Sequence, residues 1–171
     1  GLILLHSLLF NSQLSLAANS SRSMLFNQDQ TLIYSANFDT GSVSIIDAES
    51  GKLIKENTIG QDIRRIAYST DAHEPKLLVS DYLGDQLVLL NANTLAVDKR
   101  IPVPSRPFGV VFNPQHKLFY ALSFERSQLL VLDQNGDILF NLETEDAPRG
   151  MALTDDQRLL VSHALTGQVS I

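Results

Sequence analysis

The sequence predicts an all-β protein, a β-propeller built from four-stranded antiparallel blades. The first observation is an internal repeat: Phe26, Tyr68, Phe112 and Leu153 occupy equivalent positions and are 42, 44 and 41 residues apart. The second is a set of short apolar runs inside each repeat, separated by Asn, Asp, Gly and Pro. A period of about 40–45 residues with several short strands per unit is typical of a propeller blade.

The repeat divides the chain after its first 21 residues into four units. Their approximate limits are 22–61, 62–105, 106–147 and 148–171. A second set of equivalent positions, Tyr34, Val79, Tyr120 and Val161, has spacings of 45, 41 and 41. The longer second unit contains an insertion at Asp71–Pro75. Insertions confined to turns are expected of a repeated structural unit.

Each full unit is expected to form four strands. In the third unit the expected strands are 109–112, 117–123, 128–133 and 137–143. The last two are joined through Asn135-Gly136, a dipeptide that favours tight hairpin turns. The fourth unit covers only about half of this pattern, so the sequence predicts about three and a half blades. Propellers close with about 4–8 blades, so we expect these to belong to a larger propeller that continues beyond Ile171.

Composition excludes several classes of function. The net charge is −6 and the chain has no run of basic residues, which argues against a nucleic-acid partner. Without cysteine, this segment cannot hold a thiolate metal site or attach a c-type haem covalently. The histidines lack the spacing of a metal site, and no phosphate-binding loop or nucleophile motif is present. We therefore expect no cofactor, no metal and no catalytic residue in this segment.

The first 21 residues have the pattern of a secretory signal. An apolar run, Leu2–Phe10, precedes small residues at Ala17 and Ala18. The run is shorter than the roughly 20 residues that a membrane span needs. We expect an exported protein, periplasmic or secreted, with no membrane span and with cleavage after Ala17 or Ala18. The alternative is a helix or strand that packs on the domain after it.

The units resemble the YVTN family of β-propeller repeats, whose relatives include lactonases. The stretches that carry the resemblance are "RPFGVVFNPQHKLFYALS", "IYSANFDTGSVSIIDAESGKLIKENTIG" and "PRGMALTDDQRLLVSHALTGQVSI". The resemblance extends from about Arg22 to Ile171 and implies a propeller. It also implies two possible settings, a lactonase-like hydrolase or a propeller that is fused to or partners a c-type cytochrome. Because propellers support many unrelated activities, it does not select one of them.

Arginines recur near the start of the innermost strand of the units. Arg64, Arg106 and Arg149 are predicted to meet at the mouth of the central channel. Acidic side chains such as Asp62 or Asp81, or an ordered anion, are expected between them. Guanidinium groups bind carboxylates and phosphates in a bidentate manner. The alternative is that each arginine satisfies carbonyl and carboxylate groups between neighbouring blades.

Polar residues also recur where the second strand ends. Asn37, Asp81 and His163 occupy this position and are predicted to line the same mouth. Asp81 and His163 are a carboxylate and a base that an acid–base reaction would require. The alternative is a set of polar residues in solvated loops.

These patterns favour a binding or scaffold protein over an enzyme. The channel rim is predicted to engage a small anionic ligand or a protein partner, with no chemistry of its own. A lactonase-like hydrolase and a propeller that is fused to or partners a c-type cytochrome are the alternatives.

Export predicts a specific processing product. In protein expressed from the full gene, mass spectrometry should find an N-terminus near Ala18 or Asn19, because a peptidase removes the apolar segment. Recovery of intact Leu2–Phe10 in a cytoplasmic fraction would contradict export.

Overall fold

A computed structural model describes residues 21–70 and 74–171, which fold into four antiparallel sheets. The described residues contain strands and turns and no helix, so no helix that could cross a membrane is found among them. The predicted signal segment lies outside these residues except for its last position, Ser21, which begins the first strand. The predicted fold, a partial propeller of four-stranded blades, is confirmed.

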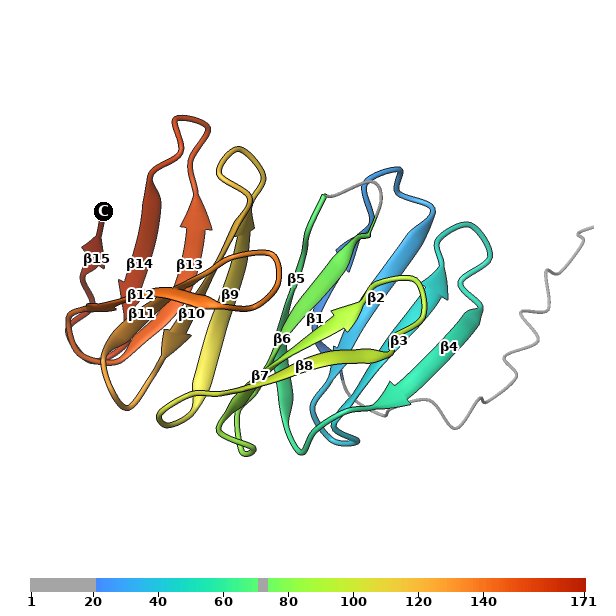
Figure 1. The fold of residues 1–171 in the computed structure, drawn as a ribbon, viewed down its shortest axis with the longest axis horizontal. Helices are drawn as coiled ribbons and strands as arrows, with labels where there is room; N and C mark the ends of the chain where they lie inside the picture. Colours follow the sequence, from blue (N-terminus) through green and yellow to red (C-terminus); the bar gives the residue numbers. More distant parts are fainter. Residues whose placement is uncertain (1–20, 71–73) are drawn as a thin grey trace, which may run out of the picture.

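Three sheets have four strands each and the last has three (Figure 1). The first blade contains β1 (Ser21–Phe26), β2 (Leu32–Asn37), β3 (Ser42–Asp47) and β4 (Leu53–Thr58). The second contains β5 (Ile63–Tyr68), β6 (Lys76–Asp81), β7 (Gln86–Asn91) and β8 (Val97–Pro102). The third contains β9 (Pro107–Asn113), β10 (Leu118–Ser123), β11 (Gln128–Leu132) and β12 (Ile138–Glu143). The fourth contains β13 (Pro148–Leu153), β14 (Leu159–His163) and β15 (Val169–Ser170).

The blades stand side by side in chain order (Figure 1). The innermost strands are in contact, β1 with β5, β5 with β9, and β9 with β13. Each blade runs outward from its innermost strand, so β4, β8 and β12 are the outer strands of the three complete blades.

The core lies between the blades. Strand β7 is buried along four consecutive residues, and alternate side chains serve different interfaces. Val88 and Leu90 pack with residues of the first blade such as Ile45. Leu87 and Leu89 pack instead with residues of the third blade such as Phe119. Adjacent side chains of a strand point to opposite faces of its sheet. A middle strand of a propeller blade therefore reads as a continuous apolar run.

Tyrosine packing joins the first two blades. Tyr34 is 1% exposed and stacks on Tyr68, with 5.7 Å between ring centroids. Burial, aided by Tyr68 and by the charge of Asp29, raises the pKa of Tyr34 to about 12. The neutral phenol is therefore the form that the folded protein stabilises.

The raised pKa makes a prediction about alkaline stability. Since the folded pKa lies above the unfolded value of about 10, the stability linked to Tyr34 is fully present below pH 10 and is lost as the pH approaches about 12. In urea unfolding monitored between pH 8 and pH 12, the Tyr34→Phe variant should lose less stability than the parent. An identical pH profile for parent and variant would contradict the assignment.

Candidate functional site: an arginine and aromatic cluster at the channel mouth

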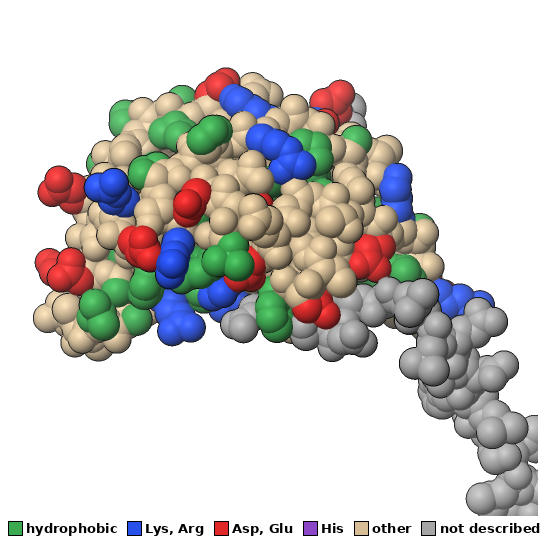
Figure 2. All heavy atoms as spheres, turned by 90° about the horizontal axis from the view of Figure 1, so that it is seen from below, with side chains coloured by type: hydrophobic (Ala, Val, Ile, Leu, Met, Phe, Trp, Pro, Cys, Tyr) green, Lys and Arg blue, Asp and Glu red, His purple; other side chains and the backbone are tan. Residues whose placement is uncertain are grey.

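The site lies at the end of the blades where the innermost strands begin. Strands β9 and β13 run upward in Figure 1, so this end is the lower one, and Figure 2 views it from below. Some of the blue Lys and Arg side chains lie near the lower edge of that view, beside hydrophobic and acidic ones, and others are spread over the rest of the face (Figure 2). The loops at this end connect one blade to the next and join the second strand of each blade to its third.

An irregularity in the innermost strand places the arginines there. In each blade the pairing between the first two strands contains a register shift near the start of the first strand. The shifts lie between Ser21 and Ser23, Ile63 and Arg65, Ala121 and Ser123, and Pro148 and Gly150. Arg64 and Arg149 are the residues at the shift in their blades. A bulge bends the strand and changes the direction of the side chain at that position. The side chains of Arg64 and Arg149 therefore do not follow the regular alternation of the strand between its two faces.

Two aromatic rings form the centre of the cluster. Tyr82 and Phe108 meet edge to face, with ring centroids 6.0 Å apart. The guanidinium of Arg64 lies 3.7 Å from the centre of the Tyr82 ring and 5.6 Å from that of Phe108. Arg106 lies 5.4 Å from the Tyr82 ring and Arg149 lies 5.0 Å from the Phe108 ring. The structure thus brings the three arginines singled out by the sequence to one pair of rings, by contacts of the cation–π type.

The three arginines differ in how their charge is balanced. Arg64 donates hydrogen bonds from Nε and Nη2 to Asp62, at distances of 2.6–3.0 Å. Asp62 is buried, so this pair is fixed and largely desolvated. Among the ion pairs of the described residues, Asp62 pairs with Arg64 alone.

Arg106 is more open to solvent. Its Nε lies 2.9 Å from Glu125 and its Nη1 lies 3.3 Å from the Tyr82 hydroxyl. The hydrogen bond to Tyr82, followed by the charge of Glu125, raises the pKa of Arg106. Arg149 is exposed and forms no ion pair with any residue that the structure describes. Arg149 is therefore the cation of the cluster that is most available to an anion from solution.

Asn37, Asp81 and His163 are placed beneath the mouth. Each ends the second strand of its blade and is at most 3% exposed. The Asn37 amide donates to Ser42 and Ser44. The Asp81 carboxylate accepts from the backbone N–H groups of residues 61 and 62 and from Gln86. Both ring nitrogens of His163 are engaged, Nδ1 with the carbonyl of residue 145 and Nε2 with Ser170.

These three side chains are buried, which differs both from the predicted lining of the mouth and from the alternative of solvated loops. Asp81 holds the loop that leads from the first blade into the second, and His163 holds the corresponding loop before the fourth. Burying an unpaired polar group costs free energy. These three side chains can be buried because their polar atoms have hydrogen-bond partners. Asp81 and His163 belong to different blades, and neither contacts the other in the described structure.

Two glycines make room for Asp81. A Cβ atom at Gly60 or at Gly84 would lie 2.4 or 2.1 Å from Asp81 Oδ2. Neither position could take a larger residue without moving the carboxylate. The sequence did not indicate their role: Gly60 meets Asp81 from the loop between two blades, and Gly84 meets it from the turn between β6 and β7.

Tyr82 and Phe108 were also missed as members of the site. A signal for both exists in the repeat. Phe108 occupies the register position that holds arginine in the neighbouring units, and Tyr82 follows Asp81 where Phe38 and Phe124 follow in the first and third units. A repeated aromatic at the channel end would have indicated a ring beside the arginines.

The opposite end of the innermost strands has a different character. A hollow of about 350 Å³ there is lined mostly by apolar side chains, including Phe26, Tyr68 and Phe112. These are three of the landmarks that defined the repeat. An anion would therefore be drawn to the arginine end.

Among the described residues no group of three His, Asp or Glu side chains could hold a metal ion.

The molecule is a partial β-propeller with a cluster of arginine and aromatic side chains at the end where its innermost strands begin. The chain belongs to the family described as the cytochrome D1 heme domain, which matches residues 11–166. The sequence prediction of a propeller family is thereby confirmed. A comparison with curated protein sequences gives no match.

Solved structures agree on the fold. The hydrazine synthase of Kuenenia stuttgartiensis is 18% identical with a TM-score of 0.80, covering 93% of this chain and 46% of that one. The dihydro-heme d1 dehydrogenase NirN, solved in complex with DHE, is 26% identical with a TM-score of 0.72, covering 89% and 34%. A structure of U3-55K is 18% identical with a TM-score of 0.76, covering 88% and 47%. The chain thus spans less than half of each of these proteins.

The position of Asp81 predicts a structural effect. Asp81→Ala leaves the backbone N–H groups of residues 61 and 62 without an acceptor. The second of these hydrogen bonds is buried and the first is partly buried, and a buried donor left unpaired costs about 1–3 kcal/mol. Urea unfolding should therefore show a loss of at least about 2 kcal/mol in the free energy of unfolding. Asp155→Ala, at an exposed carboxylate in the turn after β13, is the matched control and should change stability by less than about 0.5 kcal/mol. Equal stability of the two variants would contradict the role given to Asp81.

Proposed function

We propose that the channel mouth binds a flat anionic ligand through its carboxylates, and that this ligand is a haem of the d1 type. The observation that carries the proposal is the convergence of Arg64, Arg106 and Arg149 on Tyr82 and Phe108 in a chain of the cytochrome D1 heme domain family. The 26% identical NirN is named for a haem d1 substrate, which supports the same ligand class here.

The residues present fit the rim of such a ligand. Haems are planar and carry carboxylate side chains, and a guanidinium group offers in-plane N–H donors that match a carboxylate. Arg106 and Arg149 are exposed and would meet the carboxylates directly. Arg64, held by Asp62 and stacked on Tyr82, would keep the aromatic pair and its neighbours in place.

Neither of the two histidines that the structure describes is free to bind the iron at this mouth. His163 is buried with both ring nitrogens engaged. His116 lies in the turn between β9 and β10, at the opposite end of the blade. The haem would contribute redox chemistry at its iron when bound. The residues of this chain would bind and orient its carboxylates.

The remaining parts of the proposal concern the setting. We place the protein outside the cytoplasm, periplasmic or secreted, because residues 1–21 have the pattern of an export signal. A binding or scaffold role with a cytochrome partner is consistent with the family. The YVTN-type repeat remains our proposal for how the four units are related. The lactonase-like alternative is less favoured, because Asp81 and His163 are both engaged in holding loops.

Ligand titration tests the function. Haem d1, with iron protoporphyrin IX as a second carboxylate-bearing probe, should quench tyrosine fluorescence, since the chain has four tyrosines and no tryptophan. Arg149→Ala and Arg106→Ala should each weaken binding by roughly three- to tenfold, the loss expected for about 0.7–1.4 kcal/mol. Folding stability should change little, because both side chains are exposed.

Arg158→Ala is the control for loss of a positive charge. Arg158 is exposed, pairs with Asp156, and lies in the turn between β13 and β14, away from the mouth. The affinity of the Arg158→Ala variant for haem should match that of the parent. Equal weakening in all three variants would indicate nonspecific electrostatic attraction, and unchanged affinity in Arg149→Ala would contradict the proposed site.

A further inference from the structure

Arg106 enters the channel mouth from a strained corner of the backbone. Ser105 and Arg106 both have positive φ values, +62° and +50°. Residues other than glycine seldom adopt this left-handed region. Arg106 also precedes Pro107, and the residue before a proline is normally extended. Such a conformation persists only where the surrounding contacts hold it.

Two side chains hold this corner. The Asp85 carboxylate accepts a hydrogen bond of 2.7 Å from the backbone N–H of Arg106. The buried hydroxyl of Ser123 donates a hydrogen bond that is shared between the carbonyls of residues 104 and 105, the second at 2.8 Å. Because the backbone is fixed in this way, a change of partner at the Arg106 guanidinium has to come from side chains.

The Glu125 carboxylate occupies one side of this guanidinium. Its Oε1 lies 2.9 Å from Nε of Arg106, and its Oε2 accepts a hydrogen bond from the Ser105 hydroxyl. On the other side, Nη1 of Arg106 lies 3.3 Å from the Tyr82 hydroxyl. A guanidinium binds a carboxylate through the two nitrogens of one edge. One nitrogen of each edge of Arg106 thus has a partner already.

A ligand carboxylate therefore meets a competitor at Arg106. On the edge that contains Nε it has to displace Glu125. On the edge that contains Nη1 it would replace the Tyr82 hydroxyl, but the charge of the guanidinium would still be balanced by Glu125. In both cases Glu125 lowers the affinity of Arg106 for an anion from solution.

The other exposed arginine of the mouth has no such competitor. Glu125 lies two residues after the end of β10, and the equivalent residue after β14 is Leu165. Leucine cannot pair with a guanidinium. Arg149 forms no ion pair with any residue between 21–70 and 74–171. The two arginines that would meet a ligand directly are therefore not equivalent.

The pair of Arg106 and Glu125 is able to exchange. Their side chains are 47% and 46% exposed, so a released Glu125 carboxylate stays hydrated. Glu125 belongs to the same chain, which gives it an effective concentration on the order of millimolar or higher at Arg106. A dilute monocarboxylate competes poorly with it. A ligand that is already bound at Arg149 presents its second carboxylate at a comparable effective concentration and can displace Glu125.

We propose that Glu125 is an internal competitor that keeps Arg106 paired until a ligand anchored elsewhere at the mouth displaces it. This role rests on the function proposed above, in which ligand carboxylates meet Arg106 and Arg149. It adds the order of the two contacts, Arg149 first and Arg106 second.

Acetate tests the competition without haem. In NMR spectra of the parent, acetate should shift the side-chain Nε–H signal of Arg149 and leave that of Arg106 unchanged, relative to sodium chloride at the same concentration. In Glu125→Gln both signals should shift. Equal acetate-induced shifts of the Arg106 signal in parent and variant would overturn the proposal, whatever the result with haem.

Haem titration measures the strength of the competition. Glu125→Gln should bind haem d1 about two- to fivefold more tightly, the range for loss of a half-exposed ion pair. The gain should be smaller in the Arg106→Ala background, because the arginine that Glu125 occupies is then absent. Both Glu125 variants should melt as their parents do, and Glu125→Ala replaces Glu125→Gln if the latter does not fold.

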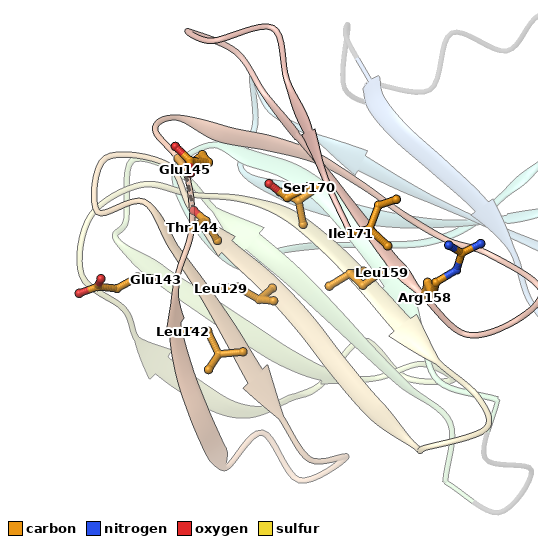
Figure 3. A pocket seen from close by; sticks show the side chains of 10 residues that line it. Leu129, Leu142, Glu143, Thr144, Glu145, Arg158, Leu159, Ser170 and Ile171 are labelled. Carbon is orange, nitrogen blue, oxygen red and sulfur yellow. Dashed lines mark hydrogen bonds between the residues drawn. The ribbon is translucent and has the colours of Figure 1, made fainter.

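Glu143→Gln is the matched control. Glu143 ends β12 at the same end of the third blade, is exposed, and forms no ion pair within the described part of the chain. It lies at the rim of a hollow of about 720 Å³ between the third and fourth blades, and its carboxylate points away from Leu129 and Leu142 (Figure 3). This variant should bind haem as the parent does.

The outcomes separate the possible roles of Glu125. Weaker haem binding by Glu125→Gln would assign Glu125 a structural role and overturn the proposal. An equal gain in Glu143→Gln, or an undiminished gain in the Arg106→Ala background, would indicate a general effect of charge and also overturn it. If no variant binds haem while acetate still reaches Arg106 only in Glu125→Gln, the proposed haem site fails and the competition by Glu125 stands.

Discussion

The constraint on which this structure depends is that the middle strands of a blade are apolar on both faces. Alternate residues of β7 enter two different core clusters, Val88 and Leu90 on one side and Leu87 and Leu89 on the other. Fully burying each such side chain is worth about 1.5–3 kcal/mol, and a single blade has nothing to bury it against. The stability of one blade is therefore inseparable from the presence of its neighbours, as in other repeat architectures.

The same stacking creates the channel mouth. Because the innermost strands lie side by side, a residue at an equivalent position in each blade approaches its counterparts in the neighbouring blades. The shift in register near the start of these strands then directs arginine side chains toward the rings of Tyr82 and Phe108. The buried corner beneath, held by Asp81, fixes the loops that carry Asp62. The hydrogen bonds of Asp81 hold the loop in place, and the exposed guanidinium of Arg149 is open to an anion from solution.

The sequence by itself determined the fold class and the repeat. Spacing of landmarks such as Phe26 and Tyr68, together with turn residues at short intervals, predicts blades, because strand alternation and turn chemistry are local properties. The register of Arg64 and Arg149 in the repeat also led to the prediction that they converge, since equivalent positions of stacked units are expected to lie close together.

Tertiary structure alone decided which polar residues face the mouth. Asn37, Asp81 and His163 share a register position as regular as that of the arginines, yet they point into the blade and hold its loops. Direction depends on a one-residue bulge and on partners distant in the chain, such as Gly60 beside Asp81. Burial is a property of the neighbouring blade, and the sequence of a strand does not contain it.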